Sequence, residues 1–217
     1  MRAVVFDLDG LLIDTERVFA EAARRLLVRR GLELEDAFMA SIMGTPGRDA
    51  LPRFRDRYRL ADPLEVLADE YKREFFAALR GGAPPLMPGA VELIDRLERH
   101  NVPKAIATSS SREYVDTVFG PHGLLDRFAF VLTCDDVTQG KPHPEVYRRV
   151  AERFGFAPAE VVVLEDSVNG LRSAKAAGAL CVVVPHAGTP REELAAADRV
   201  VPSLAAPELW YLLEVHD

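Results

Sequence analysis

The segment VVFDLDGLLIDTE, residues 4–16, places an apolar run directly before closely spaced aspartates. The run at residues 4–6 contains no polar residue, which is typical of a strand buried on both faces of a parallel sheet. Asp7 and Asp9 follow it at once. Ligands of open parallel sheets bind beyond the carboxyl ends of the strands. The sequence therefore predicts a functional site that includes both aspartates.

Apolar runs and helical patterns alternate through the rest of the chain. Further strands are expected at residues 104–107, 128–132, 161–164 and 180–184, and core helices at residues 90–100, 145–154 and 168–177. This alternation predicts an α/β fold, a doubly wound, Rossmann-like parallel sheet with right-handed crossovers.

One long segment breaks the alternation. It has no strand pattern, and helices are expected at residues 16–30, 35–43, 48–57 and 64–79. The sequence GGAPP at residues 81–85 has the composition of a linker. We therefore expect a catalytic core built from residues 1–13 and 86–217, and a helical cap domain at residues 14–85. Linkers on both sides would let the cap move as a lid.

Polar side chains also follow the other predicted strands. Thr108 and Ser109 come after the second strand, Lys141 lies on a loop after the third, and Glu165 and Asp166 follow the fourth. Each alone has a structural interpretation, as a helix cap, a turn residue or a surface lysine. Their joint occurrence, each after its own strand, favours a single site at one edge of the sheet.

The crowding of acids at this edge indicates a metal ion. Close carboxylates raise one another's pKa, and a hard cation removes that repulsion. Mg²⁺ takes oxygen ligands in an octahedron and commonly shares them with a substrate phosphate. The carboxylate of Asp7, the backbone carbonyl of Asp9 and the carboxylate of Asp166 would suit it, with Glu165 nearby.

The same residues suit phosphoryl transfer. A carboxylate such as Asp7 can attack phosphorus and form an aspartyl-phosphate. Lys141 and Thr108 can stabilise the charge of the transferring group. Asp9 can protonate the leaving oxygen and then activate water.

Four segments together resemble the motifs of the haloacid dehalogenase superfamily. They are VVFDLDGLLIDTE at residues 4–16, IATSS at 106–110, GKPHPEVY at 140–147 and VLEDSVNGLRSAKAAG at 163–178. The resemblance implies Asp7 as nucleophile, Asp9 as acid and base, Thr108 or Ser109 as the motif hydroxyl, Lys141 as the motif lysine, and Glu165 and Asp166 as metal-site acids. The helical insertion is similar to that of the subgroup containing beta-phosphoglucomutases and phosphoglycolate phosphatases.

Two residues narrow the reaction that the resemblance implies. Dehalogenases of the superfamily generally lack the second aspartate, so Asp9 argues against dehalogenation. The mutases tend to carry a histidine in the first cap helix, where this chain has Phe19. We therefore expect a magnesium-dependent phosphatase acting on a small phosphorylated metabolite, foremost a sugar phosphate. A phosphomutase and a non-catalytic binding protein on the same fold are the alternatives.

Substrate contacts are expected from Gly10, Thr108, Ser109, Lys141 and Arg48. For Arg48 a solvated arginine at a helix start is the alternative. The net charge of -7 gives no indication of a nucleic-acid partner. No apolar run approaches the ~20 residues that a membrane-spanning helix needs. We expect a cytoplasmic enzyme without nucleic-acid or membrane partners, with a monomer as the default.

Overall fold

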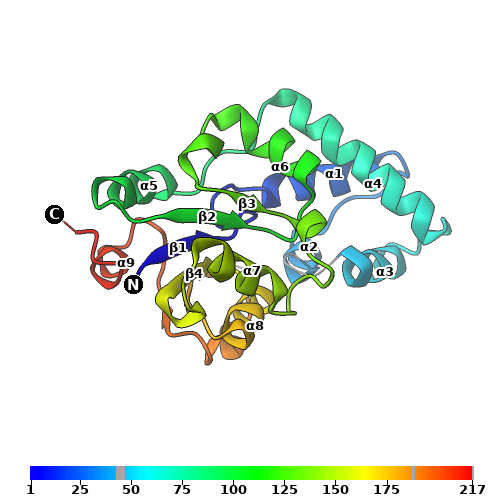
Figure 1. Ribbon diagram of the computed structural model, residues 1–217. Helices are drawn as coiled ribbons and strands as arrows, with labels where there is room; N and C mark the ends of the chain where they lie inside the picture. Colours follow the sequence, from blue (N-terminus) through cyan, green and yellow to red (C-terminus); the bar gives the residue numbers. More distant parts are fainter. Residues whose placement is uncertain (43–46, 187–188, 217) are drawn as a thin grey trace. The chain divides into compact units, whose positions relative to one another are not determined.

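The chain forms two compact units. The computed structural model describes residues 1–42, 47–186 and 189–216, without the side chains of residues 40, 48 and 80. Met1–Asp14 and Pro85–Asp217 form one unit, here called the sheet unit. Thr15–Pro84 form the other, here called the helical unit (Figure 1).

The sheet unit is built on six parallel strands. They are β1 (Ala3–Phe6), β2 (Lys104–Ala107), β3 (Val131–Leu132), β4 (Val161–Glu165), β5 (Leu180–Val183) and β6 (Arg199–Val200). Their order is β3-β2-β1-β4-β5-β6, and all the pairings are parallel. This confirms the predicted Rossmann-like α/β fold. The order reverses direction between β1 and β4, which is where such sheets bind ligands.

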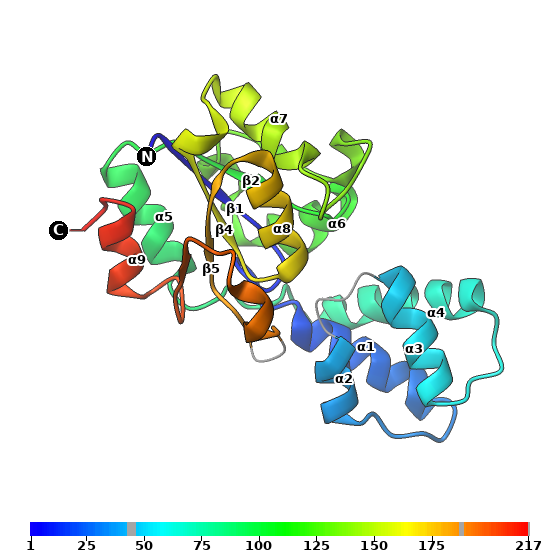
Figure 2. The ribbon, with the colours of Figure 1, turned by 90° about the horizontal axis from the view of Figure 1, so that it is seen from below.

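Helices cover both faces of the sheet. The helices of this unit are α5 (Ala90–Arg99), α6 (Arg112–Val118), α7 (Glu145–Phe154), α8 (Val168–Ala177) and α9 (Pro207–Leu212). Figure 2 shows α7 and α8 on one face and α5 and α9 on the other. Alternate residues of a strand point to opposite faces. Val5 therefore joins the core under α7 and α8, while the Phe6 ring meets Phe128 edge-on, with the ring centroids 5.8 Å apart.

Two strands differ from the sequence-based expectation. The strand expected at residues 128–132 is limited to Val131–Leu132, although the amide of Ala129 donates to the carbonyl of Lys104 in β2 at 2.9 Å. The sequence did not predict β6. Its residues are exposed and include Arg199, so they form no buried apolar run.

The four predicted helices of the inserted segment are present. They are α1 (Glu16–Val28), α2 (Asp36–Ile42), α3 (Gly47–Arg57) and α4 (Leu64–Ala78), each within two residues of its expected ends. Their apolar faces meet in a core of their own, which includes the buried side chains of Leu26, Leu27, Phe54 and Leu67.

Polar contacts tie α4 to α1 and to the turn that follows α1. The guanidinium of Arg30 lies 2.6 Å from Glu70 Oε2 and 3.2 Å from Asp62 Oδ1. The Tyr71 hydroxyl donates to the carbonyl oxygen of Phe19 at 2.9 Å. The helical unit therefore has both a separate apolar core and its own ion pairs.

The chain leaves and re-enters the sheet unit at neighbouring backbone positions. The amide of Asp14 donates to the carbonyl of Pro85 at 2.8 Å, and the amide of Met87 donates to the carbonyl of Leu12 at 2.9 Å. The insertion therefore leaves the sheet intact.

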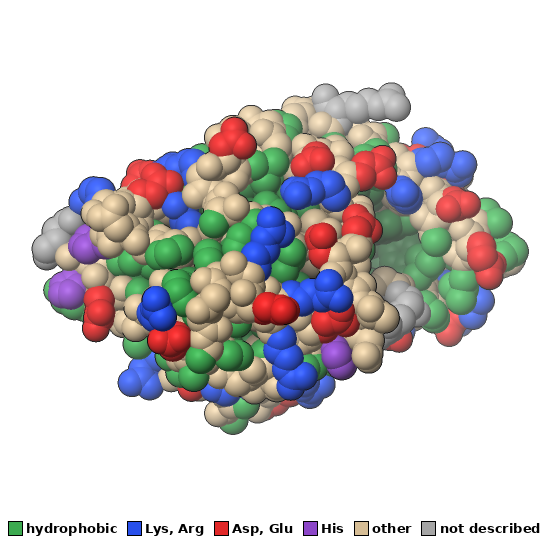
Figure 3. All heavy atoms as spheres, viewed as in Figure 1, with side chains coloured by type: hydrophobic (Ala, Val, Ile, Leu, Met, Phe, Trp, Pro, Cys, Tyr) green, Lys and Arg blue, Asp and Glu red, His purple; other side chains and the backbone are tan. Residues whose placement is uncertain are grey.

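The molecular surface carries charges of both signs. Basic and acidic side chains are interspersed over the face drawn in Figure 3. Among the described helices, none combines the length and hydrophobicity of a membrane span.

Candidate active site

Three buried carboxylates meet at the ends of two neighbouring strands. Asp7 follows β1, Glu165 ends β4, and Asp166 comes next. β1 and β4 pair in register, with Phe6 opposite Leu164. One carboxylate oxygen from each acid lies within 4.8 Å of the others. The structure thus brings together acids separated by more than 150 positions in the sequence.

Lys141 links two of these acids. Its ammonium donates to Asp7 Oδ1 at 2.5 Å, to Glu165 Oε1 at 2.7 Å and to the carbonyl of Ala107 at 2.9 Å. Burial by itself would lower the pKa of Lys141, but the negative charges of Asp7 and Glu165 outweigh it and raise the pKa above its usual value. Lys141 is therefore a cation at neutral pH.

Glu165 is the most constrained of the acids. Its Oε1 also accepts from the Tyr147 hydroxyl at 2.6 Å, and its Oε2 accepts from the Ser167 hydroxyl at 3.0 Å and from two backbone amides. Burial would raise the pKa of Glu165, but Lys141 holds it below its usual value. A carboxylate has about four lone-pair sites, so these donors engage Glu165 fully. The geometry favours Glu165 as the anchor of Lys141.

Asp7 and Asp166 have the opposite electrostatic character. Burial raises the pKa of Asp7 to about 7, against the attraction of Lys141. Burial and the charges of Asp7 and Glu165 raise the pKa of Asp166 well above its usual range. Two buried acids held in this state fit a hard divalent cation, which would favour their ionised forms. Asp7 and Asp166 are the residues we expect to hold it.

Gly10 allows Asp166 to approach the loop after β1. Its φ is +75°, and a Cβ atom at this position would lie only 2.4 Å from Asp166 Oδ2. A residue with a side chain would be strained there and would displace the carboxylate. Gly10 therefore lets the Asp166 carboxylate come close to the loop after β1, and the substrate contact expected of Gly10 stays a prediction.

Two hydroxyl groups hold the carboxylate of Asp9. The Tyr114 hydroxyl donates to Oδ1 at 2.6 Å, and the Ser110 hydroxyl donates to Oδ2 at 2.8 Å. Sequence reasoning placed Ser110 among the hydroxyl residues after the second strand without assigning it a role, and it did not single out Tyr114. Ser110 precedes α6 and Tyr114 lies in its first turn, so no helical spacing links them; their place directly after the second predicted strand is the signal that could have indicated a position at the site.

The hydroxyl candidates at the end of β2 differ in exposure. Thr108 is buried, and its hydroxyl oxygen accepts from the amide of Ser110 at 3.0 Å. Ser109 is exposed. This favours Thr108 as the motif hydroxyl. Arg48 lies in α3, and its side chain falls outside the described part of the structure.

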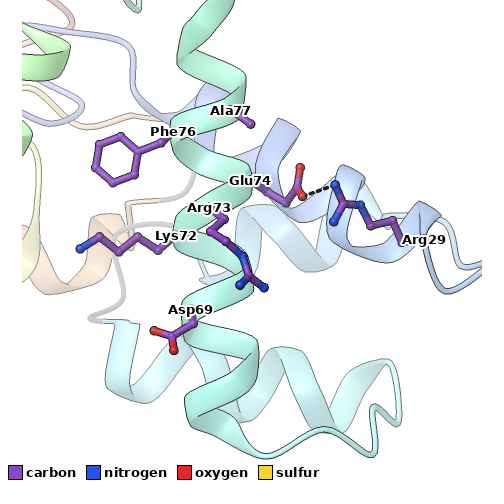
Figure 4. A pocket seen from close by; sticks show the side chains of 7 residues that line it. All are labelled: Arg29, Asp69, Lys72, Arg73, Glu74, Phe76 and Ala77. Atoms are coloured by element: carbon purple, nitrogen blue, oxygen red, sulfur yellow. Dashed lines mark ion pairs between the residues drawn. The ribbon is translucent and has the colours of Figure 1, made fainter.

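A concave region lies along α4 within the helical unit (Figure 4). It is lined by Arg29, Asp69, Lys72, Arg73, Glu74, Phe76 and Ala77. Arg29 forms an ion pair with Glu74 at 2.6 Å, so part of its positive charge is already neutralised. Three basic and two acidic side chains line this region, so their charges nearly cancel. We therefore assign the candidate chemistry to the buried acids at the edge of the sheet.

Comparison with known proteins agrees with this geometry. A family model described as haloacid dehalogenase-like hydrolase matches residues 4–184. A phosphorylated carbohydrates phosphatase of Thermotoga maritima is 35% identical over 182 residues, which is 82% of each chain.

Two solved structures are similar over nearly the whole chain. A candidate beta-phosphoglucomutase from Thermotoga maritima has a TM-score of 0.82 and 31% identity, and the match covers 99% of both chains. A variant of the CbbY protein of Rhodobacter sphaeroides, in complex with xylulose-(1,5)bisphosphate, has a TM-score of 0.76 and 29% identity, covering 94% of this chain and 95% of that one.

Proposed function

Because the chain belongs to the haloacid dehalogenase-like hydrolase family, we propose that it is a magnesium-dependent phosphatase of a small phosphorylated metabolite. The enzyme class, phosphoric monoester hydrolase, is that of its phosphatase relatives. One observation carries the proposal: Asp7 is buried after the end of β1, accepts a hydrogen bond from Lys141 and lies next to Asp166.

In the first half of the proposed reaction, Asp7 acts as the nucleophile. A carboxylate oxygen of Asp7 bonds to phosphorus while the bond from phosphorus to the ester oxygen breaks. Asp9 gives its proton to that oxygen, which leaves as an alcohol. Lys141, which holds Asp7 Oδ1, fixes the direction of the nucleophile and adds positive charge beside the phosphoryl group.

In the second half, water replaces the alcohol. Asp9 takes a proton from a water molecule as its oxygen bonds to phosphorus, and the bond to Asp7 breaks. Inorganic phosphate leaves and both carboxyl groups return to their initial states. Mg²⁺, when held by Asp7 and Asp166, supplies positive charge that offsets the crowded carboxylates and the phosphoryl oxygens.

We propose a sugar phosphate as the substrate. The support is that one relative is named for phosphorylated carbohydrates, and another is known in complex with a sugar bisphosphate. A substrate contact by Arg48 belongs to this proposal. The cap function of residues 14–85, the cytoplasmic location and the monomeric state stay predictions.

A phosphomutase is the second candidate, favoured by the similarity to the candidate beta-phosphoglucomutase. Phe19, which stands where the mutases tend to carry a histidine, argues against a phosphomutase. The Phe19 ring lies against that of Phe75, with centroids 4.9 Å apart, and it offers no group for proton transfer. Interconversion of two hexose phosphates without release of phosphate would decide for the mutase.

Phosphate release from a panel of sugar phosphates, phosphoglycolate and nucleotides tests the proposal. The assay is run with Mg²⁺, with chelator, and with Asp7→Asn. We expect turnover that requires both the metal and Asp7. Absence of release from every ester, or release that survives in Asp7→Asn, would contradict the proposal.

A further inference from the structure

The carboxylate of Asp9 is held at both oxygens by side chains from another strand connection. Asp9 lies on the loop after β1, whereas Ser110 and Tyr114 lie on the segment that follows β2. Oδ1 accepts from the Tyr114 hydroxyl at 2.6 Å, and Oδ2 accepts from the Ser110 hydroxyl at 2.8 Å. Donors on both oxygens restrict the rotation of the carboxylate plane.

The supporting segment is itself well ordered by local contacts. Ser111 caps α6, because its hydroxyl oxygen accepts from the amide of Tyr114 at 3.3 Å. The amide of Ser110 donates to the buried Thr108 hydroxyl oxygen at 3.0 Å. The two donors therefore lie on a segment held by local hydrogen bonds, between the end of β2 and the first turn of α6, which suits a positioning role.

We propose that Tyr114, together with Ser110, is a positioning residue that fixes the Asp9 carboxylate for proton transfer. This inference rests on the phosphatase function proposed above. Each carboxylate oxygen has two lone pairs, so Asp9 can accept from both hydroxyls and still present a lone pair to a water molecule. The arrangement therefore matches the state in which Asp9 receives a proton from water, the second half of the reaction.

The consequence is a defect in one identifiable step. Loss of the Tyr114 hydroxyl removes the donor to Asp9 Oδ1 and slows hydrolysis of the aspartyl-phosphate more than its formation. The phosphorylated enzyme then accumulates. Turnover becomes limited by a step that no longer contains the leaving group, so kcat becomes equal for different esters.

The test compares Tyr114→Phe with the wild type and with Tyr211→Phe, whose hydroxyl belongs to an exposed side chain. An alkyl and an aryl phosphate ester are used with Mg²⁺, and phosphoenzyme is trapped by acid quenching. We expect kcat of Tyr114→Phe to fall about tenfold or more, without a rise in KM, and the trapped fraction to increase. Ser110→Ala should change both in the same direction.

Two results would overturn the inference. One is a Tyr114→Phe enzyme that behaves like Tyr211→Phe. The other is a higher KM with no extra phosphoenzyme, which indicates a substrate contact or a folding defect.

Failure of the phosphatase proposal is recognised separately, because the wild type would then release no phosphate. The contact is still measured in that case, by a double-mutant cycle of Tyr114→Phe and Asp9→Ala in urea unfolding. Additive shifts of the unfolding midpoint would overturn the positioning inference. Non-additive shifts would support it for whatever chemistry Asp9 performs.

Discussion

At the residue scale, adjacent acids acquire different roles from their surroundings. Glu165 and Asp166 are neighbours in sequence, yet donors on both oxygens and Lys141 hold the pKa of Glu165 low. The pKa of Asp166 is raised by burial and by nearby carboxylates. The surroundings thus keep Glu165 ionised, as the hydrogen-bond partner of Lys141, and leave Asp166 as an acid whose ionised form a bound cation would stabilise.

Substitution of the two acids should therefore give different defects. Asp166→Asn should weaken Mg²⁺ binding by about 100-fold. Glu165→Gln should lower kcat by roughly 10- to 100-fold through displacement of Lys141, with a smaller change in Mg²⁺ affinity. Titration of activity with Mg²⁺, together with calorimetric Mg²⁺ binding, separates the two effects. Equal loss of Mg²⁺ affinity in both variants would instead identify Glu165 as a direct ligand.

The raised pKa of Asp7 predicts a pH-dependent stability of the metal-free protein. The folded pKa of about 7 exceeds the ordinary value of 3.8, so between these pH values the folded state binds more protons than the unfolded chain. Stability is greatest below the ordinary value and falls as the pH rises through 7, by at most about 1.4 kcal/mol per pH unit for this group. Asp166 acts in the same direction.

Urea unfolding in chelator at pH 4 to 8 measures this slope. Asp7→Asn should reduce it, and saturating Mg²⁺ should reduce it in the wild type. A stability that rises over this range in chelator, with no change in Asp7→Asn, would contradict the assignment.

At the scale of elements, the start of α8 is shaped around the end of β4. The Ser167 hydroxyl oxygen accepts from the amide of Gly170 at 3.0 Å and caps the helix, while the hydroxyl donates to Glu165 Oε2. A Cβ atom at Gly170 would lie 1.8 Å from the Glu165 carboxylate. A glycine in the first turn of α8 thus makes room for the buried acid.

This close approach predicts opposite effects of the same substitution in two helices. Gly170→Ala should destabilise the protein by roughly 2 kcal/mol or more, because it overpacks a buried site, and should reduce activity. Gly47→Ala, where no atom of the described residues lies within 4 Å of the added Cβ, should be neutral or stabilising by up to about 1 kcal/mol. Denaturant midpoints of the two variants provide the comparison. Equal midpoints would show that α8 moves to accept a methyl group.

At the scale of the molecule, two units with separate cores share one chain. The insertion joins the sheet unit where Asp14 and Pro85 are hydrogen-bonded. Trp210, the single tryptophan of the sequence, lies in α9 of the sheet unit, and the Arg96 guanidinium lies 3.8 Å from its ring centroid. Its fluorescence therefore reports on the unfolding of the sheet unit.

A substitution in the helical unit should reveal how independently the units unfold. Arg30→Ala removes a partly buried cation from Glu70 and Asp62 and should destabilise the helical unit by roughly 2 kcal/mol. Arg24→Ala, which breaks an exposed pair with Glu21, should cost no more than about 0.5 kcal/mol. We expect Arg30→Ala to shift the circular-dichroism transition more than that of Trp210 fluorescence. Coincident shifts would indicate one cooperative unit.

The sequence alone predicted the fold class and several of the residues that meet at the candidate site. Buried strands such as β1 and β4 are short apolar runs, and the helices have apolar residues at helical spacing. Both patterns are local, so they can be recognised in the sequence without the tertiary structure. Asp7, Lys141 and Asp166 were identified because each follows a recognisable strand or motif. The exposed strand β6 has no apolar run and could not be predicted from the sequence.

Only the tertiary structure decided which groups each of these residues contacts. The carboxylate of Glu165 accepts hydrogen bonds from Lys141 and Tyr147, which belong to another segment of the chain. The carboxylate of Asp9 accepts a hydrogen bond from Tyr114, which is 105 positions away in the sequence. Hydrogen bonds and desolvation depend on distances of a few ångströms between groups that the fold brings together, and local sequence patterns do not contain those distances.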